Sequence, residues 1–96
     1  MKRNSISDED ENALPLTKAE LAKLRRVAAV KRLRWELGLT QEAFAERYGI
    51  PLGTLRDWEQ GRTEPDQPAR AYLRIIALDP ERVHQLLRQS AGHRAA

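Results

Sequence analysis

Hydrophobic residues recur every three to four positions from residue 17 onward, which is the spacing of one face of an α-helix. Alternation of apolar and polar residues, the mark of a half-buried strand, is not evident, and runs of β-branched residues are absent. The pattern therefore predicts an all-α fold. Residues 1–15 are polar and show no periodicity, so we expect them to be disordered in the free protein.

The first helix should start after Thr17, because the sequence from Thr17 to Glu20 has the form of a capping box. No glycine or proline interrupts residues 17–37, so one helix could continue throughout. The apolar positions nevertheless follow two lines, Leu21, Leu24 and Ala28 on one and Val30, Leu33 and Leu37 on the other. Because a 3.6-residue repeat cannot place both lines on one face, we expect a break or kink near residues 26–29.

Capping residues and glycines mark two short helices in the middle of the chain. Thr40 is a typical N-cap for a helix over residues 41–48, which Gly49 ends. Pro51 opens the next helix, which continues to residue 60. The connection between the two helices is therefore very short.

Two further helices are predicted toward the C-terminus. Asp66 is an N-cap for a helix over residues 67–78. Asp79 followed by Pro80 marks the start of the last helix, because proline is favoured at the first helical position. From residue 91 onward we expect a frayed tail.

Composition limits the chemistry that the chain can perform. A chain of 96 residues forms one small domain whose core is marginal, which favours a dimer. There is no cysteine, and His84 and His93 lack partner ligands at metal spacing, so we expect neither a metal nor a cofactor. No nucleophile–base pair, glycine-rich phosphate loop or carboxylate cluster supports catalysis, so an enzyme is not expected.

Targeting signals are also not evident in this sequence. No apolar run approaches the roughly 18 residues that cross a bilayer. Acids follow Lys2 and Arg3 where a signal peptide would have an apolar stretch. We therefore expect a cytoplasmic protein.

Charge is distributed unevenly along the chain. The 17 Lys and Arg against 14 Asp and Glu leave a net charge of +3. Residues 1–15 carry a net charge of −2, and the rest of the chain carries +5. A basic body with an acidic arm suits a polyanion as the partner of the body, although many ordinary solvated surfaces are equally basic.

Residues 41–60 combine the features of a helix-turn-helix unit. Gly49 can adopt the positive φ that the turn needs, and Ala45 is the small residue where the helices cross. Inward-facing apolar residues occur at compatible spacing, and they are Phe44, Tyr48, Ile50, Leu55 and Trp58.

The run LGLTQEAFAERYGIPLGTLRDWEQGRTEP resembles the Cro/cI-like (XRE) helix-turn-helix family, over about residues 30–78. The resemblance implies a compact five-helix domain in which the start of the second motif helix reads base edges in double-stranded DNA. The residues that would contact DNA are Gln41, Leu52, Gly53, Thr54, Arg56, Asp57, Arg62 and Thr63.

The resemblance also implies roles for individual residues. Gln41 would contact a phosphate and brace the second helix, and Arg62 and Thr63 would touch phosphate. Leu52 could contact a thymine methyl group or cap the domain, and Thr54 could bond a phosphate or a base.

Arg56 could bind either a guanine or a phosphate. Asp57 would orient Arg56 rather than accept from a cytosine. Glu59 would form a structural ion pair with Arg34, and Trp58 would belong to the core.

The wider chain is similar to HigA-type antitoxins of type II toxin–antitoxin operons, through the segments LPLTKAEL, GTLRDWEQGR and PARAYLRIIALDPE. This similarity implies a homodimer that binds a near-palindromic operator, represses its own operon and neutralises a basic RelE/HigB-like toxin. A stand-alone phage-type repressor without a toxin is the alternative. Arg26 stands where we would expect a proline in this family.

Toxin binding is expected in the acidic arm and the leucines that follow it, at Asp8, Glu9, Asp10, Leu14, Leu16, Leu21 and Leu24. Acids would steer the segment to a basic partner and leucines would anchor it. Alternatively the segment only covers the core, and the toxin binds the helical body.

The C-terminal helices carry more apolar surface than a small core needs, at Ile75, Ile76, Leu78, Val83, Leu86 and Leu87. Part of it should meet a second copy across a two-fold axis, unless these residues simply close the monomer. The chain thus divides into a flexible acidic arm (1–16), a short helix (17–28), a DNA-binding and dimerisation domain (29–90) and a frayed tail (91–96).

Overall fold

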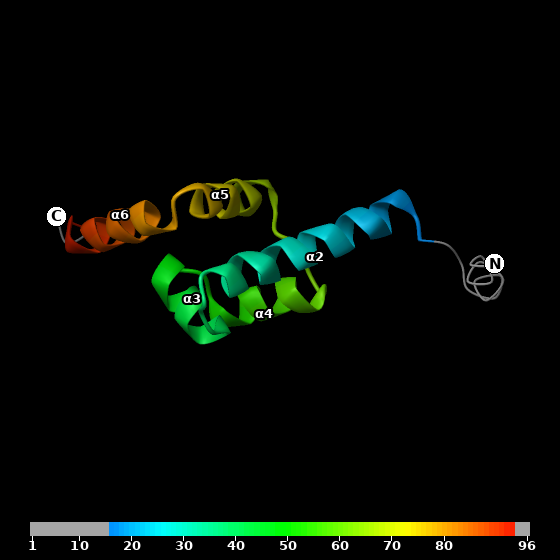
Figure 1. Cartoon of the computed structure of the whole chain (residues 1–96), viewed down its shortest axis with the longest axis horizontal. Coiled ribbons are helices and arrows are strands. Elements are labelled where there is room, and N and C mark those ends of the chain that lie inside the picture. The colour runs from blue at the N-terminus through cyan, green and yellow to red at the C-terminus, as the bar shows by residue number, and fades with distance from the viewer. Residues whose placement is uncertain (1–15, 94–96) are drawn as a thin grey trace.

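The computed structural model describes residues 16–93, which fold into five helices with no strand among them. The helices are α2 (Lys18–Glu36), α3 (Gln41–Tyr48), α4 (Leu52–Gln60), α5 (Gln67–Leu78) and α6 (Pro80–His93). Figure 1 shows α3 and α4 side by side under the C-terminal half of α2, with α5 and α6 following on the other side. The all-α, five-helix fold expected from the sequence is confirmed. Within residues 16–93, no helix has both the length and the apolar character needed to cross a membrane.

α2 continues through residues 26–29, so the break expected there is not present and that expectation was wrong. Its start is as predicted: the Thr17 hydroxyl accepts from the Glu20 N–H at 3.0 Å, and the Glu20 carboxylate accepts from the Thr17 N–H at 2.8 Å. The boundary drawn between residues 28 and 29 therefore falls inside one helix.

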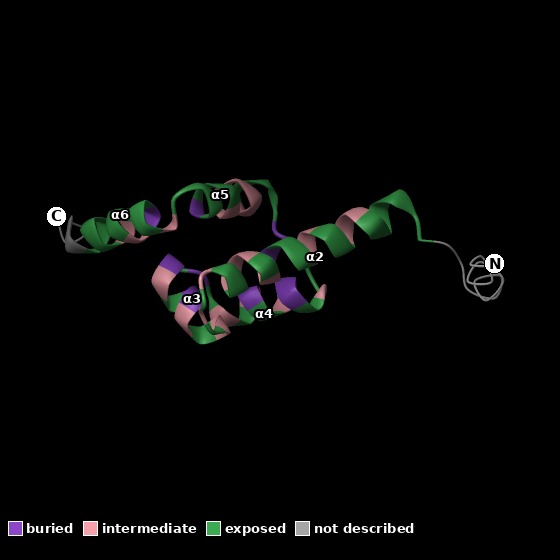
Figure 2. Cartoon of the chain, viewed as in Figure 1, coloured by how far each residue is buried: buried purple, intermediate pink, exposed green. Residues whose placement is uncertain are grey.

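The two apolar lines of α2 lie on two different faces of this single helix. Val30 is buried, and Leu33 and Leu37 pack against the core. Leu21 and Leu24 are exposed. Figure 2 shows the same contrast, since the N-terminal half of α2 is mostly exposed and its C-terminal half lies next to the buried residues of α3 and α4. The change of phase marks a second apolar face, not a second helix.

The core lies inside the helix-turn-helix unit, and residues of α2, α5 and α6 pack against it. The predicted inward-facing set is confirmed, because each member is buried: Phe44, Tyr48, Ile50, Leu55 and Trp58. Ala45 is buried between them, and Gly49 adopts the positive φ of +68° that the turn requires. Burial of these side chains holds α3 and α4 at a fixed angle.

α5 and α6 are tied to α3 by two tyrosine hydroxyls. The hydroxyl of Tyr48 donates to the carbonyl of Pro80 at 3.2 Å, and the hydroxyl of Tyr72 donates to the carbonyl of Tyr48. Ile76 and Val83 complete the core from these helices. α6 continues to His93, and the fraying expected from residue 91 stays a prediction.

Candidate nucleic-acid interface

α3 and α4 carry most of the residues predicted to contact DNA, and local signals hold each helix in place. The Thr40 hydroxyl accepts from the Ala43 N–H at 3.0 Å and caps α3. Ile50 is buried in the turn, and Leu55 faces the interior from α4. The other side of α4 is therefore directed away from the core.

The residues predicted to contact DNA are all at least partly accessible. Exposed positions are Gly53, Arg56, Arg62 and Thr63, and half-buried positions are Gln41, Leu52, Thr54 and Asp57. Leu52 also packs against the core, so part of its side chain caps the domain. The structure places these residues on α4, at the start of α3 and in the segment after α4.

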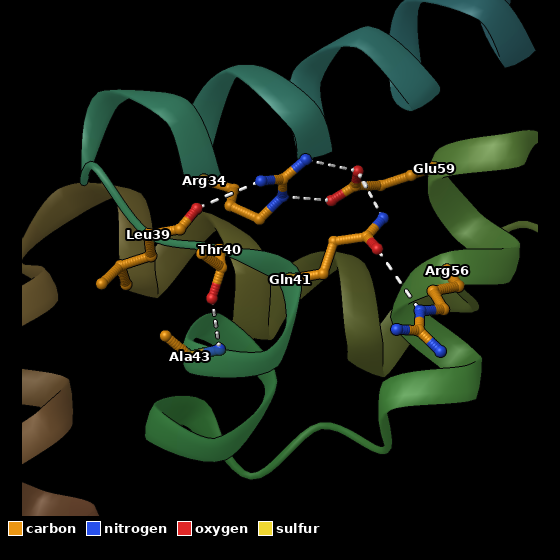
Figure 3. A network of polar contacts seen from close by, with 7 residues as sticks. All are labelled: Arg34, Leu39, Thr40, Gln41, Ala43, Arg56 and Glu59. Atoms are coloured by element: carbon orange, nitrogen blue, oxygen red, sulfur yellow. Dashed lines mark hydrogen bonds and ion pairs between the residues drawn. The ribbon is translucent and has the colours of Figure 1, made fainter.

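Behind this surface lies the ion pair between Arg34 of α2 and Glu59 of α4 (Figure 3). The two guanidinium nitrogens Nε and Nη2 donate to the two carboxylate oxygens at 2.7 and 2.8 Å, which is a bidentate arrangement. Nη1 of Arg34 also donates to the carbonyl of Leu39 at 3.1 Å. Glu59 is only 3% exposed, so this pair is part of the interior.

The electrostatics of this pair are those of a buried but well-satisfied carboxylate. Burial by itself raises the pKa of Glu59, but hydrogen bonds from Arg34 and Gln41, together with the charge of Arg34, outweigh it and lower the pKa. The hydrogen bond to Glu59 raises the pKa of Arg34. Both groups are therefore held in their charged forms, and the pair locks α4 against α2.

Gln41 connects this interior pair to the outer face. Its side-chain nitrogen donates to Glu59 at 3.1 Å, and its side-chain oxygen accepts from Nε of Arg56 at 3.3 Å. A carboxylate only accepts hydrogen bonds, so Gln41 has to turn its amide nitrogen toward Glu59. Its oxygen is then left to face Arg56, as Figure 3 shows.

Arg56 has a second partner that the sequence analysis did not identify. Nη2 of Arg56 lies 3.0 Å from the Glu42 carboxylate, in an ion pair exposed to solvent. In the sequence, Glu42 has the signature of an acid in the first turn of a helix and nothing more. The two residues are on different helices, and only the crossing of α3 and α4 brings them together.

The expected role of Asp57 in orienting Arg56 is not what the structure shows. The carboxylate of Asp57 lies 3.6 Å from Nη1 of Arg62, in an exposed ion pair. Asp57 and Arg56 are adjacent in sequence but leave a helix in different directions, about 100° apart. Asp57 therefore faces the segment after α4, and Gln41 and Glu42 position Arg56 instead.

Gly53 has no structural requirement within the protein. It lies inside α4 without a positive φ, and a Cβ added there would meet no atom within 4 Å. Glycine in a helix costs about 1 kcal/mol relative to alanine. Packing within the chain thus does not explain why this position lacks a side chain.

The part of the chain that the structure describes offers no set of ligands for a metal ion. Among residues 16–93, no three His, Cys, Asp or Glu side chains cluster to hold a metal ion. The surface offers guanidinium, amide and hydroxyl donors and one small apolar contact, together with the carboxylates of Glu42 and Asp57, each paired with an arginine. Such donors recognise phosphates and base edges.

Comparison with known proteins agrees with this geometry. A helix-turn-helix family model matches residues 30–69, which include α3 and α4. A HTH XRE-family like protein from Agrobacterium tumefaciens, known from its crystal structure, is 68% identical in sequence to this chain. The two structures superpose with a TM-score of 0.61. The match covers 62% of this chain and 95% of that one. Because nearly all of that relative is matched at this identity, the chain belongs to the XRE family of helix-turn-helix proteins.

Proposed function

We propose that the chain is a sequence-specific DNA-binding protein that regulates transcription, with α4 lying in the major groove. The observation that carries the proposal is the accessible face of α4 beside the start of α3, held by the buried pair of Arg34 and Glu59. Membership of the XRE family supports it. No enzymatic activity is proposed.

The roles of the surface residues follow from their positions. Arg56 and Thr54 face base edges, and Leu52 presents its exposed part to a thymine methyl group. Gly53 allows the backbone of α4 to approach the DNA closely, which accounts for a glycine that the protein interior does not need. Phosphate contacts come from Gln41, Arg62 and Thr63, and they fix the register of α4 in the groove.

Selection of duplexes from a random pool tests this function. The full chain should enrich one near-palindromic sequence and bind it roughly a thousandfold more tightly than a scrambled duplex at physiological salt. Equal affinity for selected and scrambled duplexes would contradict sequence-specific binding.

We further propose that the protein is the antitoxin of a type II operon, which represses that operon and neutralises a basic RelE/HigB-like toxin in the cytoplasm. Support comes from Leu16, just before α2, and from Leu21 and Leu24 in the N-terminal half of α2, which are 51%, 39% and 53% exposed. Exposed apolar side chains gathered in one place, as Leu16 and Leu24 are beside the partly exposed Val27, mark a surface for a protein partner. Part of the proposed toxin site lies outside the described residues, namely Asp8, Glu9, Asp10 and Leu14.

The toxin proposal is tested with the product of the neighbouring gene. Leu21→Ser combined with Leu24→Ser should abolish capture and neutralisation of that product while DNA binding persists. Trp35→Ser, which removes an exposed apolar side chain from the C-terminal half of α2, is the matched control and should still neutralise it. If the double variant still silences the toxin, the helical body binds it. If the neighbouring gene encodes no such toxin, the protein is a stand-alone repressor of phage type.

A homodimer formed through α5 and α6 completes the proposal. Of the apolar residues predicted for this surface, Ile76 and Val83 belong to the monomer core. Ile75, Leu78 and Leu86 are 52%, 84% and 46% exposed and form the proposed contact. The operator half-sites should then be about one helical turn apart. Sedimentation of the protein alone and on DNA tests the dimer, and a monomer under both conditions would refute it.

A further inference from the structure

Arg56 is already engaged on two sides in the DNA-free protein. Gln41 accepts from its Nε, and Glu42 accepts from its Nη2. Gln41 is in turn held by the buried Glu59, so its oxygen keeps its direction. The side chains of Arg56 and Glu42 are 45% and 65% exposed, so their pair lies at the surface where DNA is proposed to bind.

The pair with Glu42 changes what Arg56 gains from each kind of DNA contact. A phosphate offers an anion in exchange for the anion that Arg56 already has, and it leaves Glu42 facing the DNA backbone uncompensated. A phosphate and a guanine can both accept two hydrogen bonds from one guanidinium, but O6 and N7 of guanine belong to an uncharged edge that brings no second anion beside Glu42. The free energy gained when Arg56 exchanges Glu42 for a phosphate is therefore small, and the gain is larger when Arg56 exchanges Glu42 for guanine.

We propose that Glu42 is a specificity-determining residue, which withholds Arg56 from DNA phosphates and releases it where a base edge accepts two hydrogen bonds. The inference rests on the proposed DNA-binding function and assigns Glu42, at the same site, a role in specificity. Gln41 is a positioning residue in this arrangement, since it sets the direction from which Arg56 leaves the protein.

The test compares Glu42→Gln with Glu46→Gln in the full chain. Both substitutions remove one negative charge from an exposed position of α3, but the ion pair with Arg56 is formed by Glu42. The probes are a mixed-sequence duplex and the duplex obtained by selection, each titrated over a range of salt concentrations.

We expect Glu42→Gln to tighten binding of the mixed-sequence duplex about fivefold more than Glu46→Gln does. The dependence of log K on log salt should steepen by roughly 0.9 for that duplex, because Arg56 then neutralises one more phosphate. On the selected duplex the salt dependence should stay as in the unsubstituted protein, since Arg56 is released there in either case. In an Arg56→Ala background the difference between the two glutamine variants should disappear.

Two results overturn the inference. One is an equal effect of Glu42→Gln and Glu46→Gln on the mixed-sequence duplex. The other is an extra effect of Glu42→Gln that persists without Arg56, which would assign it to repulsion of phosphate by Glu42 alone. Both leave the proposed function intact if the unsubstituted protein still prefers the selected duplex. Loss of that preference in the unsubstituted protein would instead contradict the proposed function.

Discussion

The inner and outer sides of the helix-turn-helix unit each carry an arginine–carboxylate pair, and the two pairs differ in almost every physical respect. Arg34 and Glu59 form two short hydrogen bonds in the interior, with Glu59 nearly inaccessible. Arg56 and Glu42 form one contact at the surface. A buried pair is costly to break because a lone charge stays behind, whereas water can replace either partner of an exposed pair. The inner pair is thus suited to holding the fold, and the outer pair to being exchanged for a ligand.

The largest expected effect is the loss of the inner carboxylate. Glu59→Ala should lower the free energy of unfolding by about 3–5 kcal/mol, because Arg34 is left charged and unpaired and Gln41 loses its acceptor. Glu42→Ala should change it by less than about 1 kcal/mol. Urea titration of both variants measures the contrast. Similar losses for the two variants would remove the distinction between the pairs.

The next effect concerns DNA affinity. Arg56→Ala should weaken binding to the selected duplex by about 1–3 kcal/mol and leave the scrambled duplex nearly unaffected. Arg62→Ala should weaken binding to both duplexes and flatten the salt dependence, since it acts through phosphate. Arg82→Ala removes an exposed arginine from α6 and serves as the control. If Arg56→Ala and Arg62→Ala behave alike, the outer pair has no part in base recognition.

A smaller effect is expected at Gly53, where one substitution should raise the stability of the fold and weaken DNA binding. Gly53→Ala should stabilise the folded protein by about 1 kcal/mol, because alanine is the better helix former and its methyl group meets nothing in the chain. The same methyl group should weaken binding to the selected duplex if the backbone of α4 approaches DNA closely. Thermal melting and a binding titration of one preparation check both signs. Unchanged binding would mean that the glycine is only tolerated.

The smallest effect is a change of stability with pH. Hydrogen bonds and the charge of Arg34 lower the pKa of Glu59 below its ordinary value of 4.5, although burial opposes them. The stability that this carboxylate provides is fully present above the unfolded-state pKa and is lost as the pH falls through the lower, folded-state pKa. Urea midpoints measured from neutral to acidic pH should therefore fall more for the unsubstituted protein than for Glu59→Gln. Parallel curves for the two proteins would contradict the assignment.

Local signals account for what could be predicted in advance. Thr17, Thr40 and Asp66 each cap the helix that was assigned to them, because a cap depends on a few neighbouring residues and needs no tertiary contact. The buried set around Phe44 and Trp58 follows from the periodicity of two short helices and the turn between them. Resemblance to a family pointed to Arg34 and Glu59 as partners, and the structure shows the bidentate contact.

The sequence by itself determined the caps and helices from residue 40 to residue 79, and the face of each motif helix that turns inward, because these depend on neighbours within one or two turns. Only the tertiary structure decided that α2 is one helix with two apolar faces, since periodicity reports which residues share a face and not what covers it. It also decided that Arg56 meets Glu42 and that Asp57 meets Arg62. Such contacts depend on how helices cross and where the following segment runs, and no local pattern encodes either.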